Sequence, residues 1–463
     1  MPFIYHPPTR KTCEVCQRMD GSRPPIIHTQ NGKASAADNF PFHNWYNFVL
    51  GYTPEFPDYI LAREGVGKNH FVVDPFLGSG TTMICCKMKG IPSAGVEAND
   101  FFAFASKVKL GWNLDPVVLR RSADRLIVSL IAKYNYFQWP IVGLNLTSQQ
   151  SLNRPVPVRD YLEYAREKRP QLLVERYISD APFVKLDLLK NTISEYPWSD
   201  EGSKMFFELA YLSTILPVSN VRYGPGFGVA RPKTDADVLS VFRKRVDRMI
   251  EDLTTLDHQV IMTSSEVHMG DARALSSYFQ PRSVDLMITS PPYPGDHEYT
   301  KHSKLELIFS KFAQSMDEFR TIKQRMLRGS TTNIYKGDKE GELIKDIKDI
   351  SNVVEEIDRR LKEDGATSGF EKLYTRLIWE YFGGMYKTFQ ESLKVLKPGG
   401  KFVLLVSDSH AFKMVHIETA ELLSQVAQKA GFVNCHIELW QHKVSTSHQY
   451  KLFENILTVQ KPE

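Results

Sequence analysis

The apolar positions of this chain form two kinds of pattern, short continuous runs and spacings of three to four residues. Continuous runs bounded by turn residues predict strands that are buried on both faces. The expected strands, several of which are such runs, cover 71–73, 93–97, 267–271, 283–289, 402–406, 433–440 and 455–459. Helical spacing separates them, so the pattern predicts an α/β protein with a parallel sheet between two layers of helices. In such a sheet, a ligand lies beyond the carboxyl ends of the strands.

Two long stretches of helical and charged sequence interrupt this alternation. Residues 113–265 and 300–375 are expected to be mostly helical inserts. Nearer the C-terminus, the segment Pro398-Gly399-Gly400 predicts the end of one helix just before the 402–406 strand. Another helix should run from 418 to 430, with Gly431 as its C-cap.

Composition narrows the class of protein without changing this picture. The 463 residues are 42% hydrophobic and 24% charged, with a formal net charge of +4. That mild positive charge is compatible with a polyanionic partner and equally with an ordinary soluble protein. Five cysteines form no evenly spaced disulfide framework, and the chain shows neither an apolar run of about 18 residues nor a signal-peptide pattern at its start. We therefore expect a cytoplasmic protein without a membrane span.

A glycine-rich turn follows the first expected strand. The run Asp74-Pro75-Phe76-Leu77-Gly78-Ser79-Gly80-Thr81-Thr82 leads from that strand into a helix, and the next strand ends on Glu97. Gly78 and Gly80 would let the backbone approach a ligand closely, although a tight structural turn explains them nearly as well. The dinucleotide and P-loop patterns are both absent.

Two acidic residues at strand ends are candidate ligand contacts. Glu97 stands where a carboxylate accepts both hydroxyls of a ribose, or where a solvated acid simply ends a strand. Asp271 follows Met269-Gly270 and is either a turn former or an acceptor for an adenine amino group. Neither acid decides the function alone.

The segment Thr289-Ser290-Pro291-Pro292-Tyr293 carries the sharpest chemical signal. Two consecutive prolines force an extended backbone and remove two N–H donors, so carbonyl oxygens and the Ser290 hydroxyl face a cleft as acceptors. An exocyclic amine is a poor nucleophile because its lone pair is delocalised into the ring. Acceptors that hold both of its N–H bonds would help it to attack, and Tyr293 offers a flat face on which an extruded base can stack.

These two motifs together resemble the amino-methylating DNA methyltransferases of bacterial restriction–modification and defence systems. The 74–82 run is similar to the family's cofactor motif, and the 289–293 segment is similar to its catalytic motif. Weaker similarities are found in Gly95-Val96-Glu97, Leu396-Lys397-Pro398-Gly399-Gly400, Glu454-Asn455-Ile456-Leu457 and the segment from Pro41-Phe42-His43-Asn44-Trp45-Tyr46 to Gly51-Tyr52-Thr53-Pro54.

The resemblance implies a Rossmann-like class I fold with a mixed seven-stranded sheet, S-adenosylmethionine as methyl donor, base flipping and direct transfer to the amine. It implies cofactor contacts at Asp74, Phe76, Gly78, Ser79, Gly80, Thr81, Glu97, Asp271, Asn44 and Trp45, and catalytic roles for Ser290, Pro291, Pro292 and Tyr293. Direct transfer agrees with the residues, since methylation at cytosine C5 needs a cysteine beside the proline and none is present. In the family, Ser before Pro-Pro-Tyr favours cytosine N4, whereas Asp or Asn favours adenine N6.

The order of the motifs leaves the DNA-reading segment open. We expect an arm at 1–40, core segments at 41–112, 266–299 and 376–463, and inserts at 113–265 and 300–375. Arg and Lys of the first insert, or the run Arg325-Met326-Leu327-Arg328-Gly329-Ser330 in the second, are candidates for contacts with duplex DNA. A cognate restriction endonuclease or other defence protein is a possible partner.

Several alternatives remain open at this point. The same fold could methylate adenine N6, could act on RNA, or could be a silent DNA-binding subunit. Cys13 and Cys16, with His6 and His28 nearby, suggest a zinc site only weakly, because one Cys pair with irregular His spacing is more often coincidental, and no metal is therefore assigned.

Overall fold

The computed structural model describes residues 40–48, 50–135, 137, 139, 160–223, 226–295, 298–365, 368–410, 412–444 and 451–463. The expected arm, apart from Phe40, lies outside these residues, and so do Cys13, Cys16 and the two histidines near them. In the described part of the chain, no helix combines the length and the apolar character needed to cross a membrane.

Seven strands form one mixed sheet in the order β5-β2-β1-β6-β7-β9-β8. Their bounds are β1 Val72–Asp74, β2 Ser93–Glu97, β5 Ser265–Met269, β6 Val284–Thr289, β7 Leu396–Ser407, β8 Val433–Val444 and β9 Lys451–Gln460. The first five strands of that order pair in parallel, while β9 runs antiparallel to both of its neighbours. This arrangement confirms the predicted Rossmann-like class I fold with a mixed seven-stranded sheet.

The helices are α1 Glu55–Arg63, α2 Thr81–Met88, α3 Asp100–Leu110, α4 Pro116–Asn135, α5 Tyr161–Lys168, α6 Asp180–Glu195, α7 Glu201–Val218, α8 Val238–Thr254, α9 His258–Ile261, α10 Lys304–Phe309, α11 Met316–Arg325, α12 Lys348–Glu363, α13 Tyr374–Val395 and α14 Thr419–Ala430.

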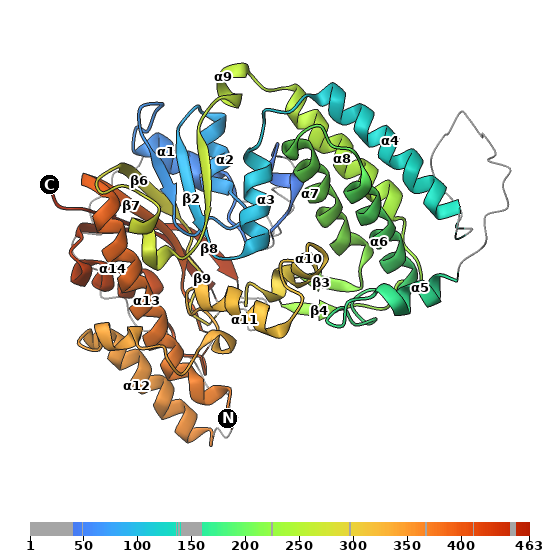
Figure 1. Cartoon of the computed structure of the whole chain (residues 1–463). Coiled ribbons are helices and arrows are strands. Elements are labelled where there is room, and N and C mark those ends of the chain that lie inside the picture. Colours follow the sequence, from blue (N-terminus) through green and yellow to red (C-terminus); the bar gives the residue numbers. More distant parts are fainter. Residues whose placement is uncertain are drawn as a thin grey trace. The chain divides into compact units, whose positions relative to one another are not determined.

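Successive strand residues point to opposite faces of the sheet. Val72 and Leu286 therefore pack with α1 and α2, while Val73 and Met287 pack with α13 and α14 on the other face. The two helical layers are visible in Figure 1.

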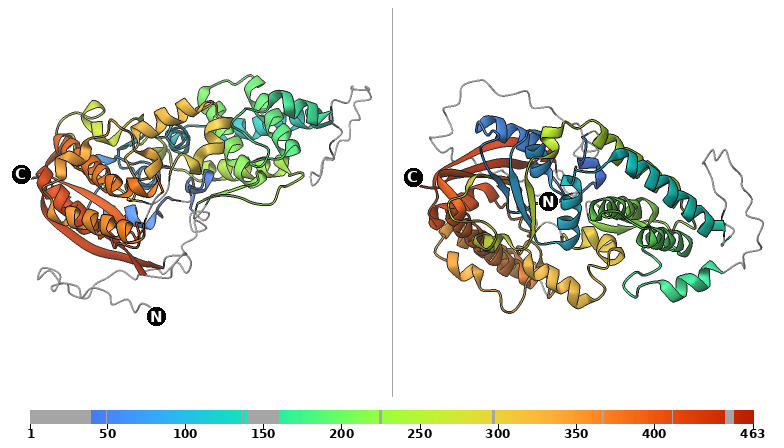
Figure 2. Two further views of the ribbon diagram at one scale, coloured as in Figure 1. Left: turned by 90° about the horizontal axis from the view of Figure 1, so that it is seen from below. Right: turned by 45° about the horizontal axis from the view of Figure 1, so that its top comes forward.

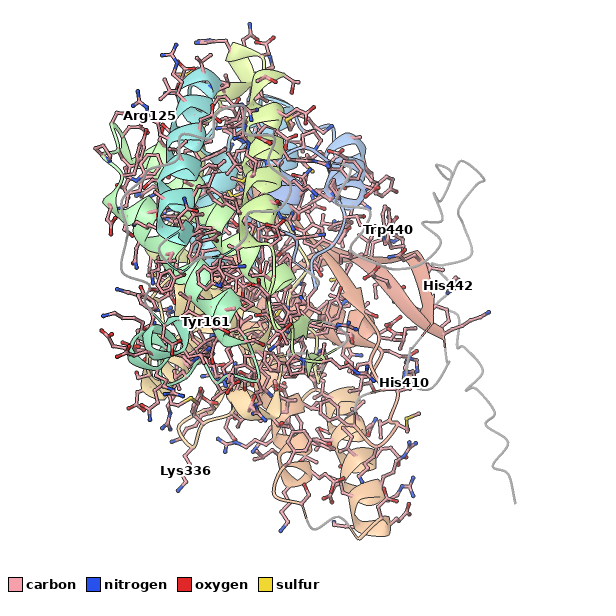
Figure 3. The ribbon with its side chains drawn as sticks, turned by 90° about the vertical axis from the view of Figure 1, so that its right-hand side faces the viewer. Arg125, Tyr161, Lys336, His410, Trp440 and His442 are labelled. Atoms are coloured by element: carbon pink, nitrogen blue, oxygen red, sulfur yellow. The ribbon has the colours of Figure 1, made fainter. Side chains whose placement is uncertain are left out.

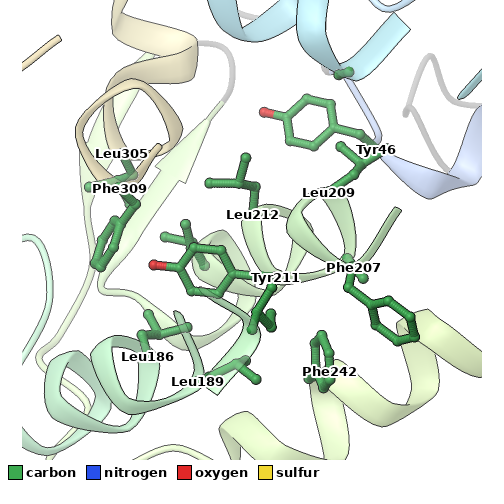
Figure 4. Close-up of a cluster of buried hydrophobic side chains, with 14 of the residues drawn as sticks. Tyr46, Leu186, Leu189, Phe207, Leu209, Tyr211, Leu212, Phe242, Leu305 and Phe309 are labelled. Carbon is green, nitrogen blue, oxygen red and sulfur yellow. The ribbon is translucent and has the colours of Figure 1, made fainter. Parts of the chain in front are cut away.

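Helices α4, α6, α7 and α8 pack on one another and form a helical body between β2 and β5 in the sequence. Figure 2 shows the same four helices together from two further directions. Their buried side chains, among them Leu189, Phe207 and Phe242, form one cluster with Leu305 and Phe309 of α10 and with Tyr46 (Figure 4). The helical body is thereby packed against the segment that follows the catalytic motif.

The structure extends or corrects several predicted elements. The glycine-rich stretch after Asn220 forms a small antiparallel hairpin, β3 (Val221–Tyr223) and β4 (Phe227–Val229), which helical periodicity could not reveal. Strand β7 begins at Leu396, earlier than predicted, because Pro398-Gly399-Gly400 is accommodated within the strand by a register shift and a positive φ of 70° at Gly399. Helix α14 ends at Gly431 in the left-handed conformation, as predicted.

Candidate functional site

The cofactor-like and catalytic motifs meet at the carboxyl ends of two adjacent parallel strands. Strand β1 ends at Asp74 and leads into the glycine-rich turn, while β6 ends at Thr289 and leads into Ser290-Pro291-Pro292-Tyr293. The Thr289 hydroxyl donates a 2.6 Å hydrogen bond to Oδ1 of Asp74. Two segments more than 200 residues apart therefore border one site, as the sequence predicts.

The carboxylate of Asp74 is completely buried and holds this junction together. Besides Thr289, its donors are the Tyr52 hydroxyl at 2.8 Å and the backbone N–H of Phe76 at 3.1 Å. Tyr52 is also hydrogen-bonded to Thr82, at the start of α2. Burial raises the pKa of Asp74, and these hydrogen bonds oppose that rise. Asp74 therefore shapes the turn from inside and has few acceptor positions left for a ligand.

The glycine-rich turn adopts a conformation that glycine favours. Gly78 and Gly80 have φ values of 53° and 88°. At Gly80, an added Cβ would also lie 3.1 Å from the Ser106 hydroxyl oxygen. Helix α3 holds the turn by its carbonyls, since Ser106 donates to Gly78 O at 2.9 Å and Lys109 Nζ donates to Ser79 O at 2.7 Å. Burial lowers the pKa of Lys109 to about 7.

Glu97 faces the same turn from the end of β2. Its Oε2 accepts the backbone N–H of Gly78 at 2.7 Å, and its Oε1 accepts that of Asn99 at 2.8 Å. Each carboxylate oxygen keeps a second lone pair, which is the acceptor pattern that a vicinal diol needs. Burial raises the pKa of Glu97 to about 7, although the backbone hydrogen bonds from Asn99 and Gly78 oppose this shift.

Asp271 follows β5 and is engaged mainly by its neighbour. Its carboxylate caps the next helical turn through the Arg273 backbone N–H and also accepts from the Arg273 guanidinium, at 2.7 to 3.1 Å. The same guanidinium reaches Glu340 at 2.9 Å. Asp271 is therefore both a turn former and part of an ion-pair network, and each of its carboxylate oxygens accepts two hydrogen bonds from Arg273.

The predicted catalytic motif follows directly on the last residue of β6. The Ser290 and Tyr293 hydroxyls lie 3.0 Å apart, and the Tyr293 hydroxyl also lies 3.4 Å from Leu405 O on β7. Pro291 is buried, while Ser290 and the Tyr293 ring are half-buried. The motif is therefore supported from β7 and keeps its polar groups near the surface of the site.

Glu298 anchors the loop that follows this motif. The side chain is buried and accepts from Lys323 Nζ at 2.5 Å and from the Thr332 hydroxyl at 2.6 Å. Burial raises the pKa of Glu298, but the hydrogen bonds from Lys323, Thr300 and Thr332 outweigh it and hold the pKa at about 2. A backbone hydrogen bond of 3.0 Å from Gly295 N to Gly329 O adds a second tie to the same region.

Comparison with curated proteins gives three methyltransferases. Type II methyltransferase M.BsoBI from Geobacillus stearothermophilus is 21% identical over 451 residues, covering 89% of this chain and 83% of that protein. Type II methyltransferase M.MvaI from Kocuria varians is 22% identical over 77% of this chain and 74% of that protein. Type II methyltransferase M.MjaII from Methanocaldococcus jannaschii is 38% identical over 69 residues, 15% of this chain and 13% of that protein. No protein-family model matches the chain.

Over most of its length, the chain is similar to Type II methyltransferases. This similarity supports the family that the two motifs indicate. The predicted cofactor residues Ser79 and Thr81 are buried in the turn and the first turn of α2, and Phe76 is half-buried beside them.

The predicted cofactor contacts Asn44 and Trp45 lie in a short buried segment that packs against the helical body. Trp45 is completely buried, its Nε1 donates to Asp252 of α8 at 2.8 Å, and its ring packs against Phe206 of α7. Asn44, also buried, precedes it in the same short 3₁₀ turn. Phe48 instead lies beside the cofactor turn, 3.9 Å from the position of a Cβ on Gly78. The upstream segment thus reaches the site through Phe48, because Trp45 is used to hold the helical body.

Sequence reasoning missed the residues that support the site from behind. Ser106, Lys109 and Glu298 lie outside the two motifs and carry no motif that marks them in a single sequence. One signal was available for Ser106 and Lys109, because they are three residues apart in a predominantly apolar stretch and therefore share one helix face. Which partner that face meets depends on the tertiary fold.

Proposed function

We propose that this methyltransferase transfers a methyl group from S-adenosylmethionine to N4 of a cytosine flipped out of duplex DNA. The observation that carries this proposal is the convergence of the glycine-rich turn and Ser290-Pro291-Pro292-Tyr293 at neighbouring strand ends, joined by the Thr289–Asp74 hydrogen bond. A donor held at the first segment and an amine held at the second would face each other across the site.

The residues at the first segment fit an adenosine-containing methyl donor. Glu97 has acceptor positions for the two ribose hydroxyls, and Asp271 would accept an adenine amino group in place of one of its contacts with Arg273. The positive φ angles of Gly78 and Gly80 expose backbone that a ligand can approach, and Phe48 supplies an apolar wall beside Gly78. The bound cofactor would supply an electrophilic methyl group on a sulfonium.

The residues at the second segment would orient and polarise the amine. Pro291 and Pro292 contribute no N–H groups, so the acceptors near the amine are carbonyl oxygens and the Ser290 hydroxyl. By holding both N–H bonds, these acceptors direct the nitrogen lone pair toward the methyl group. The chain needs no base for this step, since the proton can leave to water after transfer, and the rate gain comes from positioning.

The preference for cytosine N4 over adenine N6 rests on Ser290, because the resemblance associates serine at this position with cytosine. The Tyr293 ring would stack on the flipped base. We also propose that residues between α4 and α8 contact the DNA around the target base. A restriction endonuclease that recognises the same DNA site is the proposed partner protein.

Digesting DNA from cells that express the chain to nucleosides, followed by mass spectrometry, tests the proposal. N4-methylcytosine is expected in these cells and absent from cells that express a Ser290→Ala variant. N6-methyladenine without N4-methylcytosine would assign the enzyme to adenine. Methyl transfer to structured RNA in place of duplex DNA would overturn the DNA proposal.

A further inference from the structure

The β3–β4 hairpin presents one face to the protein and one face to solvent. Tyr223 and Phe227 are a cross-strand pair on the inner face, where the Tyr223 hydroxyl donates to Glu306 of α10 at 2.9 Å. Arg222 and Gly228 are the neighbouring cross-strand pair, and both are exposed. Because strand side chains alternate, Arg222 belongs to the outer face.

Contacts of the inner face place the hairpin near Glu298, which follows the predicted catalytic motif in the sequence. The Tyr223 ring lies 5.8 Å from the ring of His302, and His302 Nδ1 lies 3.2 Å from the backbone oxygen of Glu298. Glu298 anchors the loop that begins at Ser290, so the hairpin is tied to the segment that leaves the catalytic motif. Figure 1 shows β3 and β4 beside α10 and α11.

The exposed cations of this region are not neutralised by the protein. Among the residues that the structure describes, no carboxylate lies within 4 Å of the charged nitrogens of Arg176, Arg222 or Arg231. Arg176 and Lys304 both lie over the ring of Tyr177, at 5.2 and 4.8 Å. Burial tends to raise the pKa of Tyr177, but hydrogen bonds from Arg176 and Lys304 outweigh it and lower the pKa, which indicates positive potential here.

The arginines predicted in the second insert behave differently. Arg325 pairs with Asp100 and donates to Ala98 O at 3.2 Å. Arg328 is buried, pairs with Asp338 at 2.8 Å and donates to three backbone carbonyls. These two side chains are used within the protein, so they are poor candidates for contacts with DNA.

Neither the backbone conformation nor the packing around position 228 requires glycine there. Its φ lies outside the left-handed region, and an added Cβ would meet only Arg222 O, at 3.9 Å. A strand interior loses stability with glycine, so glycine there often marks a place where another backbone approaches. Here it leaves open space on the strand position that pairs with Arg222.

We propose that the outer face of the β3–β4 hairpin, with Arg222 opposite Gly228 and with Arg176 and Arg231 nearby, binds the phosphate backbone of duplex DNA beside the target base. The inference rests on the proposed DNA methyltransferase function. It assigns the phosphate contacts to the first insert. A two-stranded ribbon is also narrow enough to lie along a DNA groove.

Fluorescence anisotropy with a labelled duplex of random sequence tests this proposal, since phosphate contacts do not depend on sequence. The variants are Arg222→Ala, Arg231→Ala, their double mutant and Gly228→Val. Arg125→Ala is the matched control, because Arg125 is exposed at the outer surface of α4 (Figure 3). Thermal unfolding and cofactor calorimetry of each variant check that the fold is intact.

Each arginine substitution should weaken binding several-fold and reduce the slope of log affinity against log salt by about 1. The double mutant should reduce that slope by about 2, and Gly228→Val should lower affinity without lowering the melting temperature. Arg125→Ala should change neither affinity nor slope. A double mutant that keeps the wild-type affinity and slope would overturn the assignment. Variants that weaken the binding of structured RNA but not of duplex DNA would also overturn it.

Binding is measured here without methyl transfer, so the two proposals fail separately. A wild-type chain that methylates cytosine but whose hairpin variants bind normally would refute the hairpin surface alone. Hairpin variants that lose duplex affinity in a chain without methyl transfer would support the surface and refute the reaction. A wild-type chain that does not bind duplex DNA would refute both.

Discussion

The Thr289 hydroxyl lies 2.6 Å from Oδ1 of Asp74, and both side chains are completely buried. This hydrogen bond joins the last residue of β6 to the last residue of β1. It therefore fixes the spacing between the two segments that would hold the methyl donor and the amine.

Thr289→Val keeps the shape of the side chain but removes this donor. Because Asp74 would lose one of its hydrogen bonds in a buried position, we expect a loss of about 1–3 kcal/mol in the free energy of unfolding. Urea unfolding measures it, with Thr289→Ser as the control that retains the hydroxyl. Equal stability of the valine variant and the wild type would show that the bond contributes nothing.

Ser290→Ala should retain cofactor binding and lose most methyl transfer. The Ser290 hydroxyl is expected to act on the amine. The proposed cofactor residues, Glu97 and the glycine turn, belong to other strand ends and are not changed by this substitution. Calorimetry measures cofactor affinity, and transfer of a labelled methyl group measures turnover. Ser277→Ala, at an exposed serine, is the control. A Ser290→Ala enzyme as active as the wild type would remove this role.

Cofactor affinity should increase with pH through Glu97. Burial raises the pKa of Glu97 to about 7, and only the ionised carboxylate can accept from both ribose hydroxyls. The ionised fraction, and with it the affinity, should rise roughly tenfold between about pH 6 and pH 8. Glu97→Gln should bind the cofactor more weakly and lose this pH dependence, as calorimetry at several pH values can check. The same rise in the glutamine variant would assign it to another group.

Stability should depend on pH through Glu306. This carboxyl is buried, accepts from Tyr46 at 3.1 Å and Tyr223 at 2.9 Å, and has a pKa raised by burial to about 7. Since its folded pKa lies above the ordinary value of 4.5, its contribution is complete below pH 4.5 and is lost as pH rises to 7. The difference is up to roughly 3 kcal/mol.

The matched variant for that effect is Glu306→Gln, which cannot ionise. Urea unfolding at pH 5 and pH 8 should give a smaller difference for the variant than for the wild type. The methyl-transfer assay is not needed for this comparison. Identical pH profiles of the two proteins would mean that Glu306 does not titrate in this range.

The sequence allowed the sheet and the two motif-bearing strand ends to be predicted, because both depend on local patterns. Apolar runs identify β6 and β7, and the glycines of the turn identify a backbone with positive φ. The supporting groups could not be predicted, since Lys109 and Glu298 contact the site through the tertiary fold. Trp45 illustrates the same limit, because an aromatic residue near a motif can equally serve a neighbouring core.

The buried carboxylate of Glu306 also has a consequence for how two ligands could influence each other. Glu306 accepts a hydrogen bond from Tyr223 of the β3–β4 hairpin. It also accepts one from Tyr46, in the segment that reaches Phe48 next to Gly78. A polyanion that shifts the hairpin would therefore also shift the segment beside Gly78, where the proposed methyl donor would bind. By thermodynamic linkage, any gain in affinity that one ligand gives to the other must be returned by the same factor.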